Sequence, residues 1–133
     1  MKFEGLRVRD LMRTEVKTIN KDAELAEAAR MMYESRLASL VIKPEDDSDA
    51  FGILTRKDIF EALLLDGTGE CSSRVEDMMS KPAITVTPGL SIENCLRLMR
   101  VAGARRLPVV EGTKLLGIIT STDIFDRIVS SKC

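Results

Sequence analysis

The sequence predicts a mixed α/β protein formed by two related β-α-β-β-α units, and three observations carry that prediction. The chain of 133 residues is 44% hydrophobic but only 4% aromatic, which suits a compact protein with an aliphatic core. A set of short motifs occurs twice in the same order. Within each copy, short β-prone runs alternate with segments whose apolar residues recur at helical spacing.

The duplication is visible in motifs that recur at an almost constant offset. The run DLM at 10–12 recurs as DMM at 77–79, and GILTRKD at 52–58 recurs as GIITSTD at 117–123. Chance does not produce this many ordered matches with one small gap. We therefore treat the chain as a tandem repeat of one structural unit.

The boundaries of the repeats follow from the positions of these motifs. The offset changes inside 43–50, where the first copy carries the longer acidic stretch KPEDDSDA. We assign the first repeat to 8–65 and the second to 75–130. The intervening residues 66–74 are rich in Gly and Ser and are expected to be the linker.

Each repeat is expected to contain the same elements in the same order. A β-prone run and an amphipathic helix open the repeats, at 16–19 and 23–35 in the first copy and at 83–86 and 90–101 in the second. Two buried strands and a second helix follow, at 38–42, 51–54 and 56–65 in the first copy and at 106–110, 116–119 and 121–130 in the second. The run EGTK between the last two strands indicates a tight hairpin. Neither copy has enough elements to enclose a core alone, so the two pseudo-symmetric copies are expected to pack face to face through their sheets.

Composition argues against several functional classes. Lys and Arg number 20 and Asp and Glu number 21, so no general electrostatic attraction to nucleic acid or to an anionic membrane is expected. No apolar run approaches the roughly 18 residues that cross a bilayer, and the N-terminal run MKFEGLRVRD lacks the apolar core of a signal peptide. These features predict a cytoplasmic protein.

The residue types that most enzymes use are scarce. Histidine, the commonest general base and zinc ligand, is absent. The three cysteines are widely spaced, with no C-x-x-C pair, and no Walker-type glycine loop is present. Cys95 falls in an apolar helical stripe and is expected in the core. We therefore expect no catalytic residues and no metal site. The acidic run at 45–49 lacks the spacing of a calcium loop and is interpreted as a solvated connection.

The repeated signature Gly-h-h-Thr-x-x-Asp, where h is an apolar residue, allows two interpretations that are not exclusive. Thr55 and Thr120 can cap the following helices, with Asp58 and Asp123 completing capping boxes. The same groups can also bind a nucleotide. A helix start with a hydroxyl nearby accepts a phosphate, and a carboxylate one turn later accepts hydrogen bonds from a ribose diol.

Basic residues near the signatures add to the second interpretation. Arg105 and Arg106 precede the LPVV strand, and Arg56 and Lys57 lie inside the first signature. Guanidinium groups suit bidentate contacts to phosphate. Each of these residues can equally be a solvated surface charge.

The combined pattern resembles the CBS domain, the family named after cystathionine beta-synthase. The resemblance rests on D-h-M, the T-h run, the amphipathic helix, LPVV and G-h-h-T-x-x-D, and it covers residues 8 to 125. Its double occurrence resembles a tandem CBS pair. The resemblance implies a disc with two clefts between the copies, where such pairs commonly bind AMP, ADP, ATP, S-adenosylmethionine or an NAD-type ligand.

The resemblance also implies roles for individual residues. Ribose hydroxyls would be bound by Asp58 and Asp123, and phosphate or ribose by Thr55 and Thr120. The remaining members of the implied nucleotide-binding set are Lys57, Thr122, Arg105 and Arg106.

The first copy departs from the family pattern. Its strand at 38–42 has no proline and no basic pair before it, and its following connection is long and acidic. The two clefts are therefore expected to be unequal.

These observations lead to two functional hypotheses. The first is a non-catalytic sensor that binds an adenine-containing ligand, requires no cofactor and acts on an unidentified effector protein. The alternative is a CBS-fold dimerisation or interaction module that binds no ligand. In either case a symmetric homodimer is expected, through apolar faces of the helices that begin at Arg56 and Ser121. Direct contact with membranes or nucleic acid is not expected.

Overall fold

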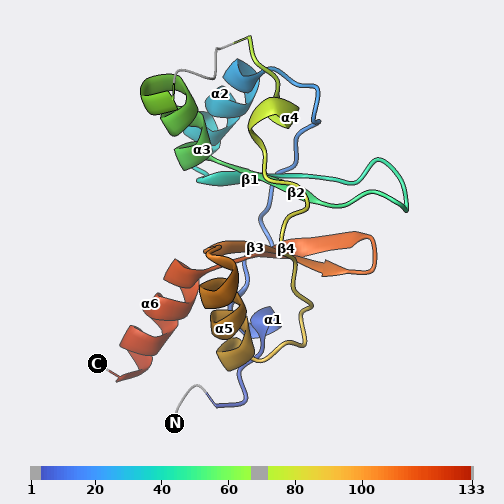
Figure 1. Cartoon of the computed structure of the whole chain (residues 1–133). Helices are drawn as coiled ribbons and strands as arrows, with labels where there is room; N and C mark the ends of the chain where they lie inside the picture. The colour runs from blue at the N-terminus through green and yellow to red at the C-terminus, as the bar shows by residue number, and fades with distance from the viewer. Residues whose placement is uncertain (1–3, 67–71, 133) are drawn as a thin grey trace. The chain divides into compact units, whose positions relative to one another are not determined.

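A computed structural model describes residues 4–66 and 72–132, and two compact units can be distinguished in it (Figure 1). One unit comprises residues 17–83. The other combines residues from 84 onward with the N-terminal segment that ends at Val16. The short segment ahead of each repeat's first β-prone run therefore belongs to the unit built mainly from the other repeat. Most of the expected linker, with Cys71, lies outside the described residues, and so does Cys133.

The unit of residues 17–83 is a two-stranded antiparallel hairpin with helices on one face (Figure 1). Its strands are β1 (Ser39–Ile42) and β2 (Gly52–Thr55). Its helices are α2 (Leu25–Ser35), α3 (Arg56–Glu61), which continues as the π-helical turn η1 (Ala62–Asp66), and α4 (Val75–Met78). The core consists of Ile19, Leu25, Ala28, Met32, Leu40, Ile42, Leu54, Ile59 and Val75.

The second unit repeats this arrangement. Its strands are β3 (Arg106–Glu111) and β4 (Lys114–Thr120), joined by the tight turn that the EGTK run predicts, with Gly112 at φ 62°. Its helices are α1 (Val8–Leu11), α5 (Ile92–Ala102) and α6 (Ser121–Lys132). The core consists of Val8, Val86, Ile92, Cys95, Met99, Leu107, Val109, Ile119 and Ile124.

The expected fold class is confirmed, because the chain combines helices with two small antiparallel sheets. The core position of Cys95 is confirmed as well, and burial raises the pKa of its thiol. The β-prone runs differ from expectation. Each contributes a single parallel bridge, Thr18 to Val41 in one unit and Val86 to Val109 in the other.

The D-h-M motifs lie at the ends of two four-residue helices, α1 and α4, that were not expected. Asp10 accepts a hydrogen bond from the Arg7 backbone N–H at 2.7 Å, and Asp77 accepts one from the Arg74 backbone N–H at 2.9 Å. Each carboxylate thus satisfies an N–H group at the start of a helix, which explains why Asp opens both motifs.

The residue after each D-h-M motif crosses the second strand of its unit. Arg13 exchanges two backbone hydrogen bonds with Ile118, of 2.8 and 2.9 Å. In the other unit Ser80 exchanges two with Ile53, of 2.9 and 3.0 Å. Arg13 and Ser80 occupy the same position in the two repeats. Each crossing segment therefore pairs with the second strand of its hairpin through one antiparallel bridge.

The glycine of the G-h-h-T-x-x-D signature lies directly beneath this crossing. A Cβ atom at Gly117 would overlap the backbone carbonyl of Arg13, which is held by the crossing hydrogen bonds. A Cβ atom at Gly52 would meet the Sδ atom of Met79 first, at 3.2 Å. Backbone cannot yield as a flexible side chain can, so the two glycines are not equally replaceable.

We expect Gly117→Ala to lower the free energy of unfolding by about 1–3 kcal/mol, because the crossing segment must shift. Gly52→Ala is the matched control, with an expected loss below about 1 kcal/mol because Met79 can change rotamer. Urea denaturation of both variants measures the difference. Equal losses would contradict the steric role of Gly117.

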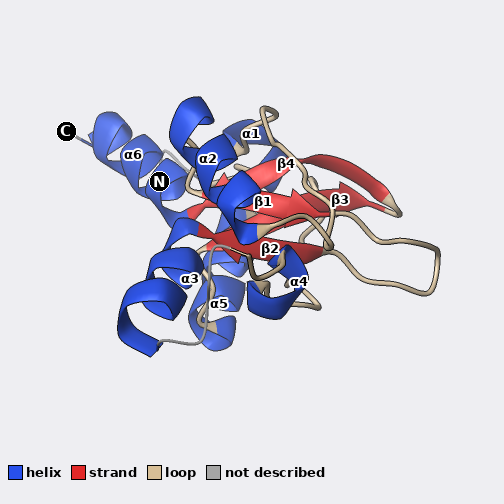
Figure 2. Cartoon of the chain, turned by 90° about the horizontal axis from the view of Figure 1, so that it is seen from above, coloured by secondary structure: helices blue, strands red, loops and turns tan. Residues whose placement is uncertain are grey.

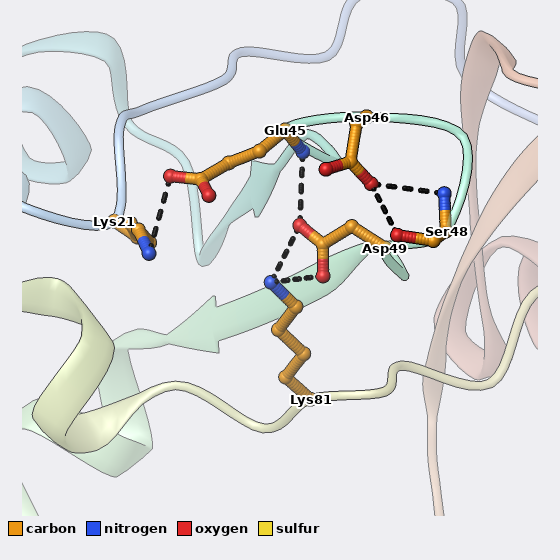
Figure 3. Close-up of polar contacts among 6 residues, drawn as sticks. All are labelled: Lys21, Glu45, Asp46, Ser48, Asp49 and Lys81. Atoms are coloured by element: carbon orange, nitrogen blue, oxygen red, sulfur yellow. Dashed lines mark hydrogen bonds and ion pairs between the residues drawn. The ribbon is translucent and has the colours of Figure 1, made fainter.

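The connection between β1 and β2, residues 43–51, extends beyond the strands as a long loop (Figure 2). Asp49 anchors it (Figure 3). Its carboxylate contacts the Lys81 ammonium at 2.7 and 2.8 Å and accepts the Glu45 backbone N–H at 2.9 Å. The side chains of Asp49 and Lys81 are only 21% and 23% exposed. These contacts, first the hydrogen bond from Lys81, lower the pKa of Asp49 to about 2.

Two further contacts order the acidic loop (Figure 3). Lys21 pairs with Glu45 at 3.1 Å. The Asp46 carboxylate accepts hydrogen bonds from the backbone N–H and the hydroxyl of Ser48, and these lower its pKa. The run is therefore tied by its own side chains and by two lysines.

The Asp49–Lys81 contact predicts a specific dependence of stability on pH. The pKa of Asp49 is lower in the folded chain than its ordinary value of 3.8, so its contribution is present above that value and is lost as the pH falls toward 2. Asp49→Asn should therefore flatten the loss of urea resistance between about pH 5 and about pH 2.5. Asp47→Asn, at an exposed position of the same loop, should behave as the unmodified chain. A loss as steep in Asp49→Asn as in the unmodified chain would contradict this assignment.

Candidate functional site

Both G-h-h-T-x-x-D signatures place a threonine and an aspartate at the start of a helix. At α3 the Asp58 backbone N–H donates to the Thr55 hydroxyl at 3.1 Å, and the Thr55 backbone N–H donates to Asp58 Oδ2 at 2.8 Å. At α6 the reciprocal bonds between Thr120 and Asp123 measure 3.1 and 3.3 Å. The capping boxes that the spacing predicts are therefore present in both units.

Among the described residues, the second signature makes two contacts that have no equivalent at the first. The Thr120 hydroxyl also donates to Asp123 Oδ2 at 2.8 Å. Arg13 Nε donates to Asp123 Oδ1, also at 2.8 Å. The Asp123 side chain is only 8% exposed, whereas that of Arg13 is 65% exposed. The hydrogen bond to Asp123, followed by its charge, raises the pKa of Arg13.

Asp58 has a simpler environment. Its Oδ2 atom accepts the Thr55 backbone N–H, and within the described residues no side chain donates a hydrogen bond to its Oδ1 atom or forms an ion pair with it. Lys57 lies next to it in sequence, but the Lys57 ammonium points along the helix to Glu61, at 3.7 Å. The Asp58 carboxylate is half-buried and keeps acceptor positions available.

The remaining residues of the expected set lie around the second signature. Arg106 is directly opposite Thr120 in the β3–β4 pair. Arg105 and Thr122 instead line a groove of about 500 Å³ against α5, together with Leu96, Ser121, Ile124, Phe125 and Ile128. The groove and the Thr120–Asp123 pair therefore involve different members of the expected set.

An equivalent groove of about 680 Å³ lies between α2 and α3 in the other unit. It is lined by Ala29, Met32, Tyr33, Glu34, Arg36, Leu37, Arg56, Ile59 and Phe60. Both grooves are bordered by large apolar side chains that remain exposed, with Phe60 at 47% and Phe125 at 63%. Each groove therefore lies on the surface of its helices, between α2 and α3 in one unit and between α5 and α6 in the other.

Arg13 is the functional candidate that the sequence did not reveal. It lies far from Asp123 along the chain, and only the crossing of β4 brings the two together. One signal was available: Arg13 and Ser80 align when the two repeats are compared. That alignment marks a difference between the copies but does not show which carboxylate it affects.

Residues 4–66 and 72–132 hold neither a metal-ligand cluster nor a membrane-spanning helix. This part of the chain contains no cluster of three or more His, Cys, Asp or Glu side chains that could hold a metal ion. None of its helices combines the length and the apolar character that a membrane span requires.

Comparison with known proteins gives the family. The model of the CBS domain matches residues 8–65 and 75–130. A homoserine O-acetyltransferase of Methanosalsum zhilinae is 32% identical over 132 residues, which are 98% of this chain and 26% of that protein. An uncharacterized protein of Methanopyrus kandleri is 34% identical over 123 residues, 92% of this chain and 62% of that protein. The chain thus spans less than two thirds of these curated relatives.

Solved structures agree with this result. A hexameric CBS-CP12 protein from bloom-forming cyanobacteria has a TM-score of 0.87 and 34% identity, over 96% of this chain and 75% of that one. A CBS domain pair in complex with 5′-methylthioadenosine and S-adenosyl-L-methionine has a TM-score of 0.81 and 24% identity, over 96% and 98%. A CBS protein in complex with AMP, CBSX2, has a TM-score of 0.77 and 22% identity, over 97% and 100%. The last two likenesses show the fold alone.

The duplicated motifs, the two units with equivalent cores and capped signatures, and the double match to the family model lead to one conclusion. The chain belongs to the CBS domain family and carries a tandem pair of CBS domains.

Proposed function

We propose that the chain is a non-catalytic regulatory module that binds an adenosine-containing ligand through its two G-h-h-T-x-x-D signatures. In this proposal Asp58 and Asp123 accept hydrogen bonds from ribose hydroxyls. Thr55, Lys57, Thr120 and Thr122, with Arg105 and Arg106, contact the remainder of the ligand. The ligand is AMP, ADP, ATP or S-adenosylmethionine, no cofactor is required, and the response is passed to a separate effector protein.

The observation that carries the proposal is the state of the Asp58 carboxylate. It is held in one orientation by the Thr55 backbone N–H, and its Oδ1 atom has no protein donor among the described residues. A carboxylate that is oriented but not saturated can accept both hydroxyls of a vicinal diol without losing its capping bond. Capping alone needs only one of the two oxygens.

The comparisons support the choice of ligand class. Two CBS proteins with the same fold were solved with adenine-containing compounds: one with 5′-methylthioadenosine and S-adenosyl-L-methionine, the other with AMP. These compounds share adenine and a ribose diol but differ in charge. The shared chemistry is what a carboxylate such as that of Asp58 would recognise.

A thermal-shift series tests this proposal. AMP, ATP or S-adenosylmethionine at about 100 times its dissociation constant adds about 2.7 kcal/mol of stability, which should raise the melting temperature by roughly 5 to 11 °C. Asp58→Asn should reduce the shift, because the carboxamide oxygen keeps the cap while the NH2 group removes an acceptor. Asp47→Asn in the acidic loop is the control.

The outcome that contradicts the proposal is equally specific. If folded protein shows no shift with any of these compounds, the chain is an interaction module without a ligand, and both signatures serve as helix caps. If a shift is seen and persists in Asp58→Asn and in Asp123→Asn, ribose recognition by these carboxylates is wrong.

We also propose that the chain assembles as a homodimer through α3–η1 and α6. Phe60, Leu64 and Phe125 are 47%, 78% and 63% exposed in the single chain, an unusual exposure for such large apolar side chains. The hexameric CBS-CP12 relative, at 34% identity, indicates that this fold can self-associate. A symmetric pair would cover these residues on both copies.

Light scattering after size exclusion tests the assembly. The unmodified chain should elute as a dimer. Phe125→Asp should raise the dissociation constant at least about 100-fold, because a charge would be buried without a partner. Lys114→Glu, at the start of β4 and outside both helices, should leave the mass unchanged. A monomeric unmodified chain, or a dimer unaffected by Phe125→Asp and Phe60→Asp, would contradict the proposed interface.

A further inference from the structure

The two signatures perform the same capping task but have different neighbours at the crossing. Arg13 crosses β4 beside Asp123, and Ser80 crosses β2 in the equivalent place. The Arg13 side chain reaches Asp123 Oδ1 at 2.8 Å. Ser80 has a short, uncharged side chain, so it supplies no equivalent cationic group. One substitution between the repeats thus decides whether the signature carboxylate has a charged partner.

The number of acceptor positions left on each carboxylate follows from these contacts. Each carboxylate oxygen can accept about two hydrogen bonds. On Asp123, Oδ2 already accepts the backbone N–H and the hydroxyl of Thr120, and Oδ1 accepts Arg13 Nε. With only 8% of the side chain exposed, Asp123 cannot receive both hydroxyls of a diol while Arg13 stays in place. On Asp58, Oδ1 is available for such a diol.

The residue opposite the signature threonine is also cationic in one unit and neutral in the other. The β3–β4 register places Arg106 opposite Thr120, whereas the β1–β2 register places Ser39 opposite Thr55. Residues directly opposite in an antiparallel pair are close enough to act on one ligand. The signature of Asp123 is therefore flanked by Arg13 and Arg106, and both corresponding positions in the other unit are serine.

The first signature contains two cations of its own, Arg56 and Lys57, but in the described part of the chain neither pairs with its aspartate. Arg56 lines the groove between α2 and α3, and Lys57 pairs with Glu61 at 3.7 Å. Within the described residues, neither contacts Asp58. Among the described residues, Asp58 therefore has no cationic contact, whereas Asp123 is paired with Arg13.

We propose that Arg13 is a specificity-determining residue that makes the Asp123 signature selective for anionic adenosine ligands, while the Asp58 signature accepts neutral ones. This inference rests on the proposed function. A neutral ligand such as adenosine would have to displace Arg13 from Asp123. It has no anionic group that could replace Asp123 as the partner of the guanidinium. A nucleotide phosphate offers a new partner, so Arg13 exchanges one anion for another when the diol takes its place on Asp123.

The geometry permits this exchange. The Arg13 side chain is 65% exposed, so the guanidinium can swing away from Asp123 while the backbone of Arg13 stays bonded to Ile118. Arginine is effectively always protonated in proteins, and the hydrogen bond to Asp123 raises the pKa of Arg13 further. The selectivity is consequently set by the charge of the ligand and not by the protonation state of Arg13.

Calorimetry with AMP and adenosine on the full chain tests the proposal. Asp58→Asn isolates the second signature, which should bind AMP at least about tenfold more tightly than adenosine. Adding Arg13→Ser should make adenosine binding tighter by about tenfold and AMP binding weaker. Tighter binding of a neutral ligand after loss of an arginine is not expected from a structural role. Arg127→Ser, at an exposed position of α6, is the charge-matched control and should change neither affinity.

The reciprocal variant gives an independent test that does not depend on the stability of Arg13→Ser. In an Asp123→Asn background, Ser80→Arg should weaken adenosine binding to the first signature by about tenfold. Serine already occupies this crossing in one unit and arginine in the other, so both exchanges suit the backbone. Unchanged AMP and adenosine affinities in both exchanges would overturn the inference. Absence of binding of AMP, ATP and S-adenosylmethionine alike to the unmodified chain would instead overturn the proposed function.

Discussion

The backbone crossing against each signature glycine is the contact on which the rest of each unit depends. It joins Arg13 to Ile118 in one unit and Ser80 to Ile53 in the other through paired hydrogen bonds. The crossing holds the preceding short helix in place, so that Val8 and Val75 complete the two cores. It also brings the side chain at the crossing to the second strand, just before the helix start that carries the signature aspartate. Fold and candidate site therefore share one constraint.

The signature aspartates show how one residue can serve structure and recognition together. Each satisfies a backbone N–H at the beginning of a helix, which orients the carboxylate without a further contact. What remains for a ligand is decided by the neighbours. The cap is present in both units, but among the described residues Asp123 has a cationic partner and Asp58 has none. The two copies have therefore kept the same architecture while their exposed chemistry has diverged.

The sequence was sufficient for the features that depend on local spacing. Apolar periodicity predicted α2, α5 and the paired strands, and the T-x-x-D spacing predicted both capping boxes. The four-residue helices α1 and α4 are too short for periodicity to reveal. The contact of Arg13 with Asp123 was missed because the alignment of repeats does not show which unit receives each N-terminal segment. That assignment depends on tertiary packing, and local patterns do not record it.

The exchange of these N-terminal segments explains why this fold needs two copies of the repeat. A single repeat on its own would carry a short helix and a crossing residue that pack into the unit of another copy. Such a chain would fill its own core only by receiving the same segment from a second molecule, as in a domain-swapped pair. In this chain both repeats lie on one polypeptide, so the exchange is intramolecular. The two crossing positions are therefore independent of each other, and one copy carries Arg13 while the other carries Ser80.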